Sequence, residues 1–153
     1  MDITSLPNSC HDKLPIAVIK SVVEDFQVDE ELGFDPCGEG EHLWVLLRKR
    51  GWNTRDVIER VAAEFKIAAR DVGYSGLKDR HAITTQWLSI PLAKVADRDN
   101  VEQQLTQALS IEENLSLLRV CCGQKKLRPG SHRFNRFTIV LRELCDATDE
   151  TNE

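Results

Sequence analysis

The sequence has no apolar run long enough to cross a membrane. Its first apolar stretch, Leu14 to Val23, is interrupted by Pro15 and Lys20 and has no basic leader, so it is not typical of a signal peptide. The chain has 153 residues, of which 41% are hydrophobic and 29% are charged, and this is enough for one globular core. We therefore expect a single soluble domain, with the cytoplasm as the default location.

Cysteine and histidine are too dispersed to form a disulfide framework or a local metal site. The cysteines are odd in number, two are adjacent, and no C-x-x-C pair occurs; they are Cys10, Cys37, Cys121, Cys122 and Cys145. The four histidines show no H-E-x-x-H or similar ligand spacing. We expect reduced thiols and no metal, unless the fold alone brings ligands together.

The two signs of charge are unevenly distributed. The net charge of −5 argues, on its own, against binding to nucleic acid. Residues 24–41 contain eight acids and no Lys or Arg, whereas residues 119–142 contain seven Lys or Arg and no acid. Because phosphates respond to local charge, the second segment is a candidate basic surface despite the negative total.

Hydrophobic periodicity predicts an α+β fold. A helix is expected to begin at Asn53 as its N-cap, and its apolar face repeats at helical spacing through Val57, Ile58, Val61, Ala62 and Phe65. A second helix is expected at residues 100–109, and a loop at residues 33–40. Strands or extended segments are predicted at residues 16–19, 42–48, 72–75, 83–90, 115–122 and 134–141. This order favours a mixed or antiparallel sheet with the helices packed on one face. We expect a flexible arm at residues 1–13, a folded domain at residues 14–142 and a disordered acidic tail at residues 143–153.

The loop from Gly76 to Arg80 places one carboxylate between two cations. Asp79 is the only acid between Asp71 and Asp97, and it is flanked by Lys78 and Arg80. Neighbouring cations favour the ionised form of a carboxylate, and they could also bind the phosphates of a polyanionic substrate. The alternative is a surface turn whose charges are solvated and contribute little.

Three separated segments resemble the TruD family of transfer-RNA pseudouridine synthases. Residues 20–30 are similar to its K-x-x-x-E-D-F-x-V-x-E pattern, and residues 76–87 to its G-x-K-D-[KR]-x-A-x-T-x-Q-W signature. Residues 126–130 and 135–137 are similar to its K-L-R-x-G and N-x-F elements. The resemblance extends from Ile16 to Arg142 in matching order, and it implies the amino-terminal part of the pseudouridine synthase catalytic fold.

The resemblance implies a reaction that breaks the N1–C1′ bond of a uridine in tRNA and reattaches the uracil through C5, with no metal or organic cofactor. Asp79 matches the catalytic aspartate. Phe137 matches an aromatic residue that stacks on uracil, although periodicity alone would place it in the core. Asn135 could bind the base edge or brace the Asp79 loop, and Lys20 could pair with Asp79 or with a phosphate.

Further residues are expected to bind RNA or to support the fold. Lys78 and Arg80 would lower the pKa of Asp79 and contact phosphate, and Glu24 and Glu30 would brace the fold. The expected RNA-facing patch, which could alternatively be a solvated charged surface, contains Lys125, Lys126, Arg128, Arg133 and Arg136. The acidic segment 24–41 should then face away from RNA. Trp44, Trp52 and Trp87 are assigned to packing.

Family members implied by the resemblance are about twice as long as this chain, so the chain corresponds to an amino-terminal half. Three functions follow as alternatives: a synthase that isomerises uridine 13 of tRNA, a non-catalytic RNA-binding fragment, or a half-domain that needs a complementing second half. Half a sheet would also leave an edge through which the chain could self-associate.

Overall fold

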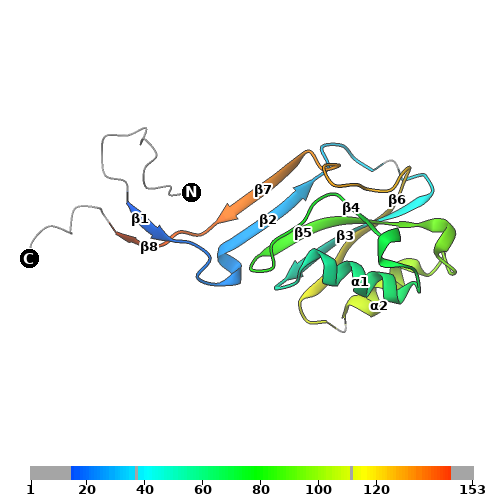
Figure 1. Cartoon of the computed structure of the whole chain (residues 1–153), viewed down its shortest axis with the longest axis horizontal. Helices are drawn as coiled ribbons and strands as arrows, with labels where there is room; N and C mark the ends of the chain where they lie inside the picture. Colours follow the sequence, from blue (N-terminus) through cyan, green and yellow to red (C-terminus); the bar gives the residue numbers. More distant parts are fainter. Residues whose placement is uncertain (1–14, 37, 111, 146–153) are drawn as a thin grey trace, which may run out of the picture.

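The computed structural model describes residues 15–36, 38–110 and 112–145 (Figure 1). The main sheet is formed by β2 (Phe26–Glu31), β3 (His42–Arg50), β4 (Gly73–Tyr74), β5 (Ile83–Pro91), β6 (Leu115–Gly123) and β7 (Phe134–Ile139). Its helices are α1 (Thr54–Glu64) and α2 (Val101–Ser110), with short 3-10 turns at η2 (Val23–Asp25), η3 (Ala69–Asp71) and η4 (Leu92–Lys94). A separate two-stranded sheet pairs β1 (Ile16–Val18) with β8 (Arg142–Cys145).

The main sheet is mixed. Its strand order is β6-β3-β5-β2-β7, and β4 adds a short pairing to β5. β2 runs parallel to β5, and the other pairings between the described strands of this sheet are antiparallel. The predicted α+β class with a mixed sheet is confirmed.

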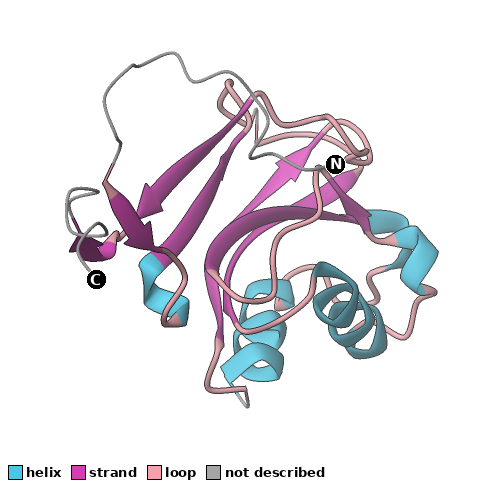
Figure 2. Cartoon of the chain, turned by 60° about the vertical axis from the view of Figure 1, so that its left-hand side comes forward, coloured by secondary structure: helices cyan, strands magenta, loops and turns pink. Residues whose placement is uncertain are grey.

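Both helices pack on one face of the sheet, as predicted (Figure 2). Side chains alternate across a strand, and Leu43, Val45 and Leu47 of β3 join the core beneath the helices. Trp44 of β3 and Trp87 of β5 point to the opposite face, where their rings lie 6.3 Å apart in an edge-on arrangement. The assignment of these two tryptophans to packing is therefore confirmed.

β2 is the strand that periodicity did not predict. Val28, Glu30 and Leu32 are buried in alternation, which is a strand pattern, but one of the three inward positions carries a carboxylate. The apolar alternation is not visible in the sequence, because the buried position 30 is occupied by a polar residue. β2 nevertheless occupies an interior position in the sheet, between β5 and β7.

The carboxyl-terminal end of the described chain is ordered further than predicted. Residues 143–145, assigned to a disordered tail, belong to β8, so that boundary was wrong. Arg142, the first residue of β8, pairs with Asp25. Its guanidinium donates two hydrogen bonds of 2.7 Å to the buried Asp25 carboxylate. These bonds hold the pKa of Asp25 below its usual value. The predicted arm at residues 1–13 and the rest of the tail lie outside the described residues.

Within the described part of the chain, no helix is both long and apolar enough to cross a membrane.

Candidate active site

A small pocket opens where β2 and β7 are not covered by the helices. Its volume is about 260 Å³, and its walls are Phe26, Val28, Leu77, Lys78, Asp79, Asn135 and Phe137. Val28 pairs in register with Thr84 on one side and with Phe137 on the other. Since paired residues share a face, the pocket is on the same face of the sheet as α1 and α2. The cavity therefore brings together Asp79 from one predicted motif and Asn135 and Phe137 from another.

Asp79 lies at the rim of this pocket and is held by Lys20. The Lys20 Nζ atom is 2.9 Å from Asp79 Oδ2, and 57% of the Asp79 side chain is exposed. Lys20 Nζ also lies 3.9 Å from the centre of the Phe26 ring, a cation–π arrangement. Lys20 itself has a φ of 58°, in the left-handed region that is uncommon for lysine. The predicted pairing of Lys20 with Asp79 is present.

The two cations adjacent to Asp79 in sequence have other partners in the described part of the chain. Lys78 Nζ lies 2.7 Å from Glu30 Oε2, and the two side chains are 4% and 0% exposed. Arg80 donates to the backbone carbonyl of Gly51 at 3.2 Å. The expectation that Lys78 contacts RNA therefore disagrees with the structure, because its ammonium group is inside the molecule. Lys78 is paired with Glu30, whereas Asp79 is paired with Lys20.

Glu30 is a structural residue, as expected. Its Oε1 atom accepts hydrogen bonds from the Ser75 hydroxyl and from the backbone N–H of Trp87. Its Oε2 atom receives the ammonium of Lys78. Glu30 thus joins β2, β5 and the loop that precedes Asp79, and the paired charges remain inside the protein.

Lys49 supports the Asp79 loop from below, and the motif analysis did not identify it. Lys49 Nζ donates to the carbonyl oxygens of Trp52, Lys78 and Asp79 at 2.6, 3.3 and 2.8 Å. Burial lowers the pKa of the ammonium from 10.5 to about 8, an effect that the negative charge of Asp79 partly offsets. The signal was present in β3, because Lys49 continues the inward series of Leu43, Val45 and Leu47.

His132 fixes the orientation of Asn135. His132 Nδ1 lies 3.0 Å from the carbonyl oxygen of Ser75, and Nε2 lies 3.1 Å from Asn135 Nδ2. Because a carbonyl only accepts, Nδ1 of the neutral ring carries the hydrogen, and Nε2 accepts from the amide of Asn135. The Asn135 Oδ1 atom is then left as a buried acceptor without a partner in the described structure. Gly76 leaves room for this arrangement, since a Cβ there would lie 2.9 Å from the His132 ring.

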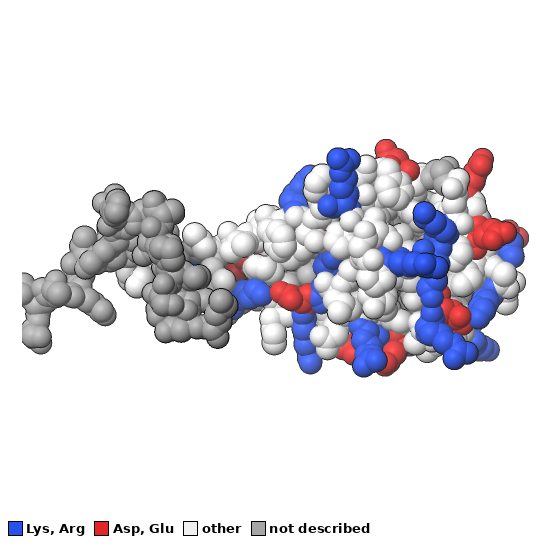
Figure 3. Space-filling model, turned by 45° about the horizontal axis from the view of Figure 1, so that its top comes forward, with Lys and Arg blue, Asp and Glu red and all other residues white. Residues whose placement is uncertain are grey.

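The predicted RNA-facing patch is not one continuous surface. Figure 3 shows basic side chains in several groups, with acidic side chains between them. Arg136 pairs with Glu31 at 2.5 Å, and Arg133 lies over the Phe134 ring at 5.1 Å. Lys126 and Arg128 line a separate and larger groove, and the backbone carbonyl of Lys125 accepts from the Trp44 indole at 2.9 Å.

The acidic segment does not face away from the basic block as a whole. β2 lies beside β7, so Glu31 meets Arg136. Asp25, which immediately precedes β2, meets Arg142 in the same way. These two acids neutralise two of the seven cations in residues 119–142. The sequence distance between the two segments hid their adjacency in the sheet. That the rest of residues 24–41 faces away from RNA stays a prediction.

Comparison with known proteins identifies the family. The sequence profile of the tRNA pseudouridine synthase D (TruD) family matches residues 14–153. The chain belongs to the TruD family. A TruD relative from Methylococcus capsulatus is 46% identical over 129 residues, which is 82% of this chain and 34% of the relative. Another from Pseudomonas fluorescens is 42% identical over 140 residues, which is 90% of this chain and 37% of the relative.

A solved TruD structure has the same fold. A crystal structure from Methanosarcina mazei that carries the TruD name superposes with a TM-score of 0.72 at 24% sequence identity. The match covers 88% of this chain and 29% of the solved chain. The chain therefore spans well under half the length of the TruD proteins it matches, a smaller share than the predicted half.

Proposed function

We propose that this chain supplies the uridine-binding part of a tRNA pseudouridine synthase, with Asp79 as the catalytic aspartate. The observation that carries the proposal is the pocket that gathers Asp79, Asn135 and Phe137 from the loop and from β7. A carboxylate, an aromatic face and an unpartnered acceptor are the groups that a flipped uridine needs.

Two residues of the pocket could bind the uracil base. Phe137 is 56% exposed and can stack on uracil, an interaction worth about 1–3 kcal/mol per base. The Oδ1 atom of Asn135 has no partner among the described residues and is shielded from solvent, and a rotation of this side chain into the pocket would let it accept the N3–H of uracil, which neutral cytosine lacks. This contact would favour uridine, because a buried acceptor left unpaired costs free energy.

Asp79 acts as a carboxylate beside the ribose. During isomerisation the N1–C1′ bond breaks, the base turns, a C5–C1′ bond forms, and the hydrogen lost from C5 is balanced by one gained at N1. Whether the carboxylate adds to C1′ or acts through the 2′ side of the sugar, it must be ionised. The ammonium of Lys20 pairs with this carboxylate at 2.9 Å.

The remaining site assignments extend the proposal to the RNA backbone. Arg80, Lys125 and Arg133 are exposed: Arg80 follows Asp79 directly, Arg133 precedes β7, and Lys125 lies in the turn after β6, beside Trp44. Together with Lys126, Arg128 and Arg136, these residues would contact phosphates of tRNA, with uridine 13 as the target and the cytoplasm as the location. Lys78 is no longer assigned to RNA, because it is buried with Glu30.

The rest of a TruD protein would cover the open side of the sheet. β7 is an edge strand, and Ile139, Val140, Leu141 and Leu144 are exposed apolar residues along β7 and β8. An uncovered edge with apolar side chains favours association with another segment. We assign this surface to the part of the longer relatives that this chain does not span.

A direct assay of pseudouridine in an unmodified tRNA transcript tests the proposal. The chain is incubated with the transcript alone and together with a polypeptide that supplies the rest of a TruD protein. Product in either mixture supports the synthase, and product only in the second supports complementation. Binding of tRNA without product in either mixture would instead favour a docking module.

A further inference from the structure

A second concavity lies on the other side of Leu77 from the Asp79 pocket. Its volume is about 810 Å³, and it is framed by α1, by the segment from η3 to β4, and by the turn after β6. The lining residues that matter for its chemistry are Arg55, Arg70, Tyr74, Leu77, Lys126 and Arg128. Only Lys126 and Arg128 belong to the basic segment recognised in the sequence; the other two cations come from α1 and η3.

The groove concentrates positive charge that is not neutralised. Four of its lining residues are Arg or Lys, and Glu59 is its only acid. In the described part of the chain, Arg55, Arg70 and Arg128 form no ion pair with a carboxylate. Arg50, Arg136 and Arg142 differ, since each is paired with Glu or Asp. A concave surface with free guanidinium groups attracts a polyanion.

The groove also has an apolar floor. Tyr74 is half-buried beside the buried side chains of Val72 and Leu127. A ring and aliphatic side chains beneath several cations suit a ligand that has flat bases as well as phosphates. A free phosphate or a simple acidic peptide would leave this floor unused.

Leu77 connects the groove to the Asp79 pocket. Its side chain lines both concavities, is 75% exposed and lies two residues before Asp79. A ligand strand in the groove would therefore pass over Leu77 and reach the Asp79 pocket. Exposed apolar side chains in such positions can fill the space that a displaced base leaves in its stack.

We infer that this groove binds the RNA segment adjacent to the target uridine, with its arginines on the phosphates and Leu77 between the target base and its neighbour. The inference rests on the proposed function, because the RNA in the groove is the substrate whose uridine enters the Asp79 pocket. It adds Arg55, Arg70, Tyr74 and Leu77 to the contact surface.

The test measures the affinity of an unmodified tRNA transcript over a series of salt concentrations. The variant Arg55→Gln/Arg70→Gln/Arg128→Gln should bind more weakly, and the slope of log affinity against log salt should decrease in magnitude by about 2, for three lost phosphate contacts. Arg98→Gln is the control, because Arg98 is exposed and lies outside the groove. All four arginines are at the surface, so these changes leave the core intact.

A second variant tests the connection through Leu77. Leu77→Ala should slow pseudouridine formation in folded tRNA more than in an unstructured oligonucleotide, because only the folded substrate must have its base displaced from a stack. Equal slowing on both substrates would overturn the role of Leu77.

The outcomes separate this inference from the proposed function. If the triple arginine variant keeps the affinity and salt slope of the Arg98→Gln control while the wild type still forms pseudouridine, the groove assignment is wrong and the proposed function stands. If the wild type with its complementing segment binds tRNA but forms no product, the proposed synthase function is wrong, whether or not the groove binds RNA.

Discussion

Two lysines hold Asp79 from different directions. Lys20 contacts the carboxylate itself, whereas Lys49 holds the backbone carbonyls of Asp79 and its neighbour Lys78. An ammonium has three N–H groups, and Lys49 uses them on three carbonyl oxygens. Lys49 is thus a positioning residue that acts through the loop.

Replacing Lys49 with Met should reduce catalysis without removing tRNA binding. The substitution leaves three carbonyls without their donor, and each unpaired buried group costs about 1–3 kcal/mol, so the loop would shift to satisfy them. We expect the rate of pseudouridine formation to fall at least tenfold while the tRNA affinity changes little. Lys94→Met is the control, since Lys94 forms an exposed pair with Asp71. Equal rates for the two variants would contradict this role.

Lys49 should also make stability depend on alkaline pH. Its pKa is about 8 in the folded chain against an ordinary 10.5, so between these values the unfolded chain binds more protons at this site. The contribution of Lys49 to the free energy of unfolding therefore rises with pH, by up to about 3 kcal/mol. Denaturant titrations at pH 7 and pH 10 should show the wild type gaining stability relative to Lys49→Met. A constant difference would show that the pKa is not lowered.

The sequence predicted residues that line the pocket better than the residues that support them. Asp79, Asn135 and Phe137 were identifiable because each belongs to a motif, and the structure brings them together. The role of Lys78 was not identifiable, because its sequence position suggested a contact with Asp79, whereas its partner Glu30 lies far away in the sequence, on β2. Contacts between distant segments, such as His132 with Ser75, have no local signal at all.

Among the secondary-structure elements, β2 depends most on polar contacts. Its buried Glu30 accepts hydrogen bonds from the Ser75 hydroxyl and the Trp87 backbone N–H, and it forms an ion pair with the Lys78 ammonium. Periodicity predicted α1, α2 and β3 because most of their buried residues are apolar. β2 was not predicted, since its inward carboxylate is compensated by partners more than forty residues away in the chain.

The pair of Glu30 with Lys78 should show strong non-additivity. Glu30→Gln places an amide N–H₂ against the Lys78 ammonium and leaves a buried charge unpaired, so we expect a loss of about 3–5 kcal/mol in the free energy of unfolding. In Glu30→Gln/Lys78→Met the charge is removed, and the glutamine oxygen can still accept from Ser75 and Trp87. Denaturant unfolding should therefore show the double variant to be more stable than the single one. A further loss in the double variant would refute this account of the pair.

On the scale of the whole molecule, the described chain has one covered and one uncovered end. The helices and the tryptophan cluster cover β3 and β5, while β7 and β8 extend away from the body with apolar side chains exposed (Figure 1). The relatives are much longer than the matched segment. Sequence analysis expected an uncovered edge; the strand order leaves β6 and β7 at the edges, and the run of exposed apolar residues Ile139, Val140 and Leu141 favours β7.

The chain alone should self-associate through this surface. Sedimentation at increasing concentration is expected to show oligomers, and Ile139→Lys/Leu141→Lys should shift them towards monomer. Leu118→Lys is the matched control, because Leu118 is an equally exposed apolar residue on β6, away from β7. A wild-type chain that stays monomeric throughout, or a control as effective as the test variant, would show that this surface does not drive association.

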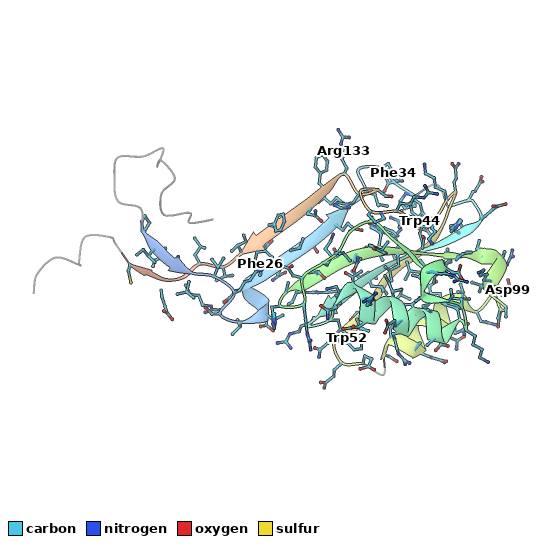
Figure 4. All side chains as sticks on the ribbon, in the orientation of Figure 1. Phe26, Phe34, Trp44, Trp52, Asp99 and Arg133 are labelled. Carbon is cyan, nitrogen blue, oxygen red and sulfur yellow. The ribbon has the colours of Figure 1, made fainter. Side chains whose placement is uncertain are left out.

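The proposed function depends above all on Asp79, to which we assign the chemistry in a pocket that binds uridine. The most direct measurement is pseudouridine formation by Asp79→Asn in the mixture that is active for the wild type, with tRNA affinity measured alongside. Asp99→Asn is the control, because Asp99 lies at the right-hand end of the molecule in Figure 4, well away from Phe26 of the pocket. We predict that Asp79→Asn binds tRNA with nearly unchanged affinity and forms no detectable product, while Asp99→Asn behaves like the wild type. Product formed by Asp79→Asn at the wild-type rate would contradict the assignment.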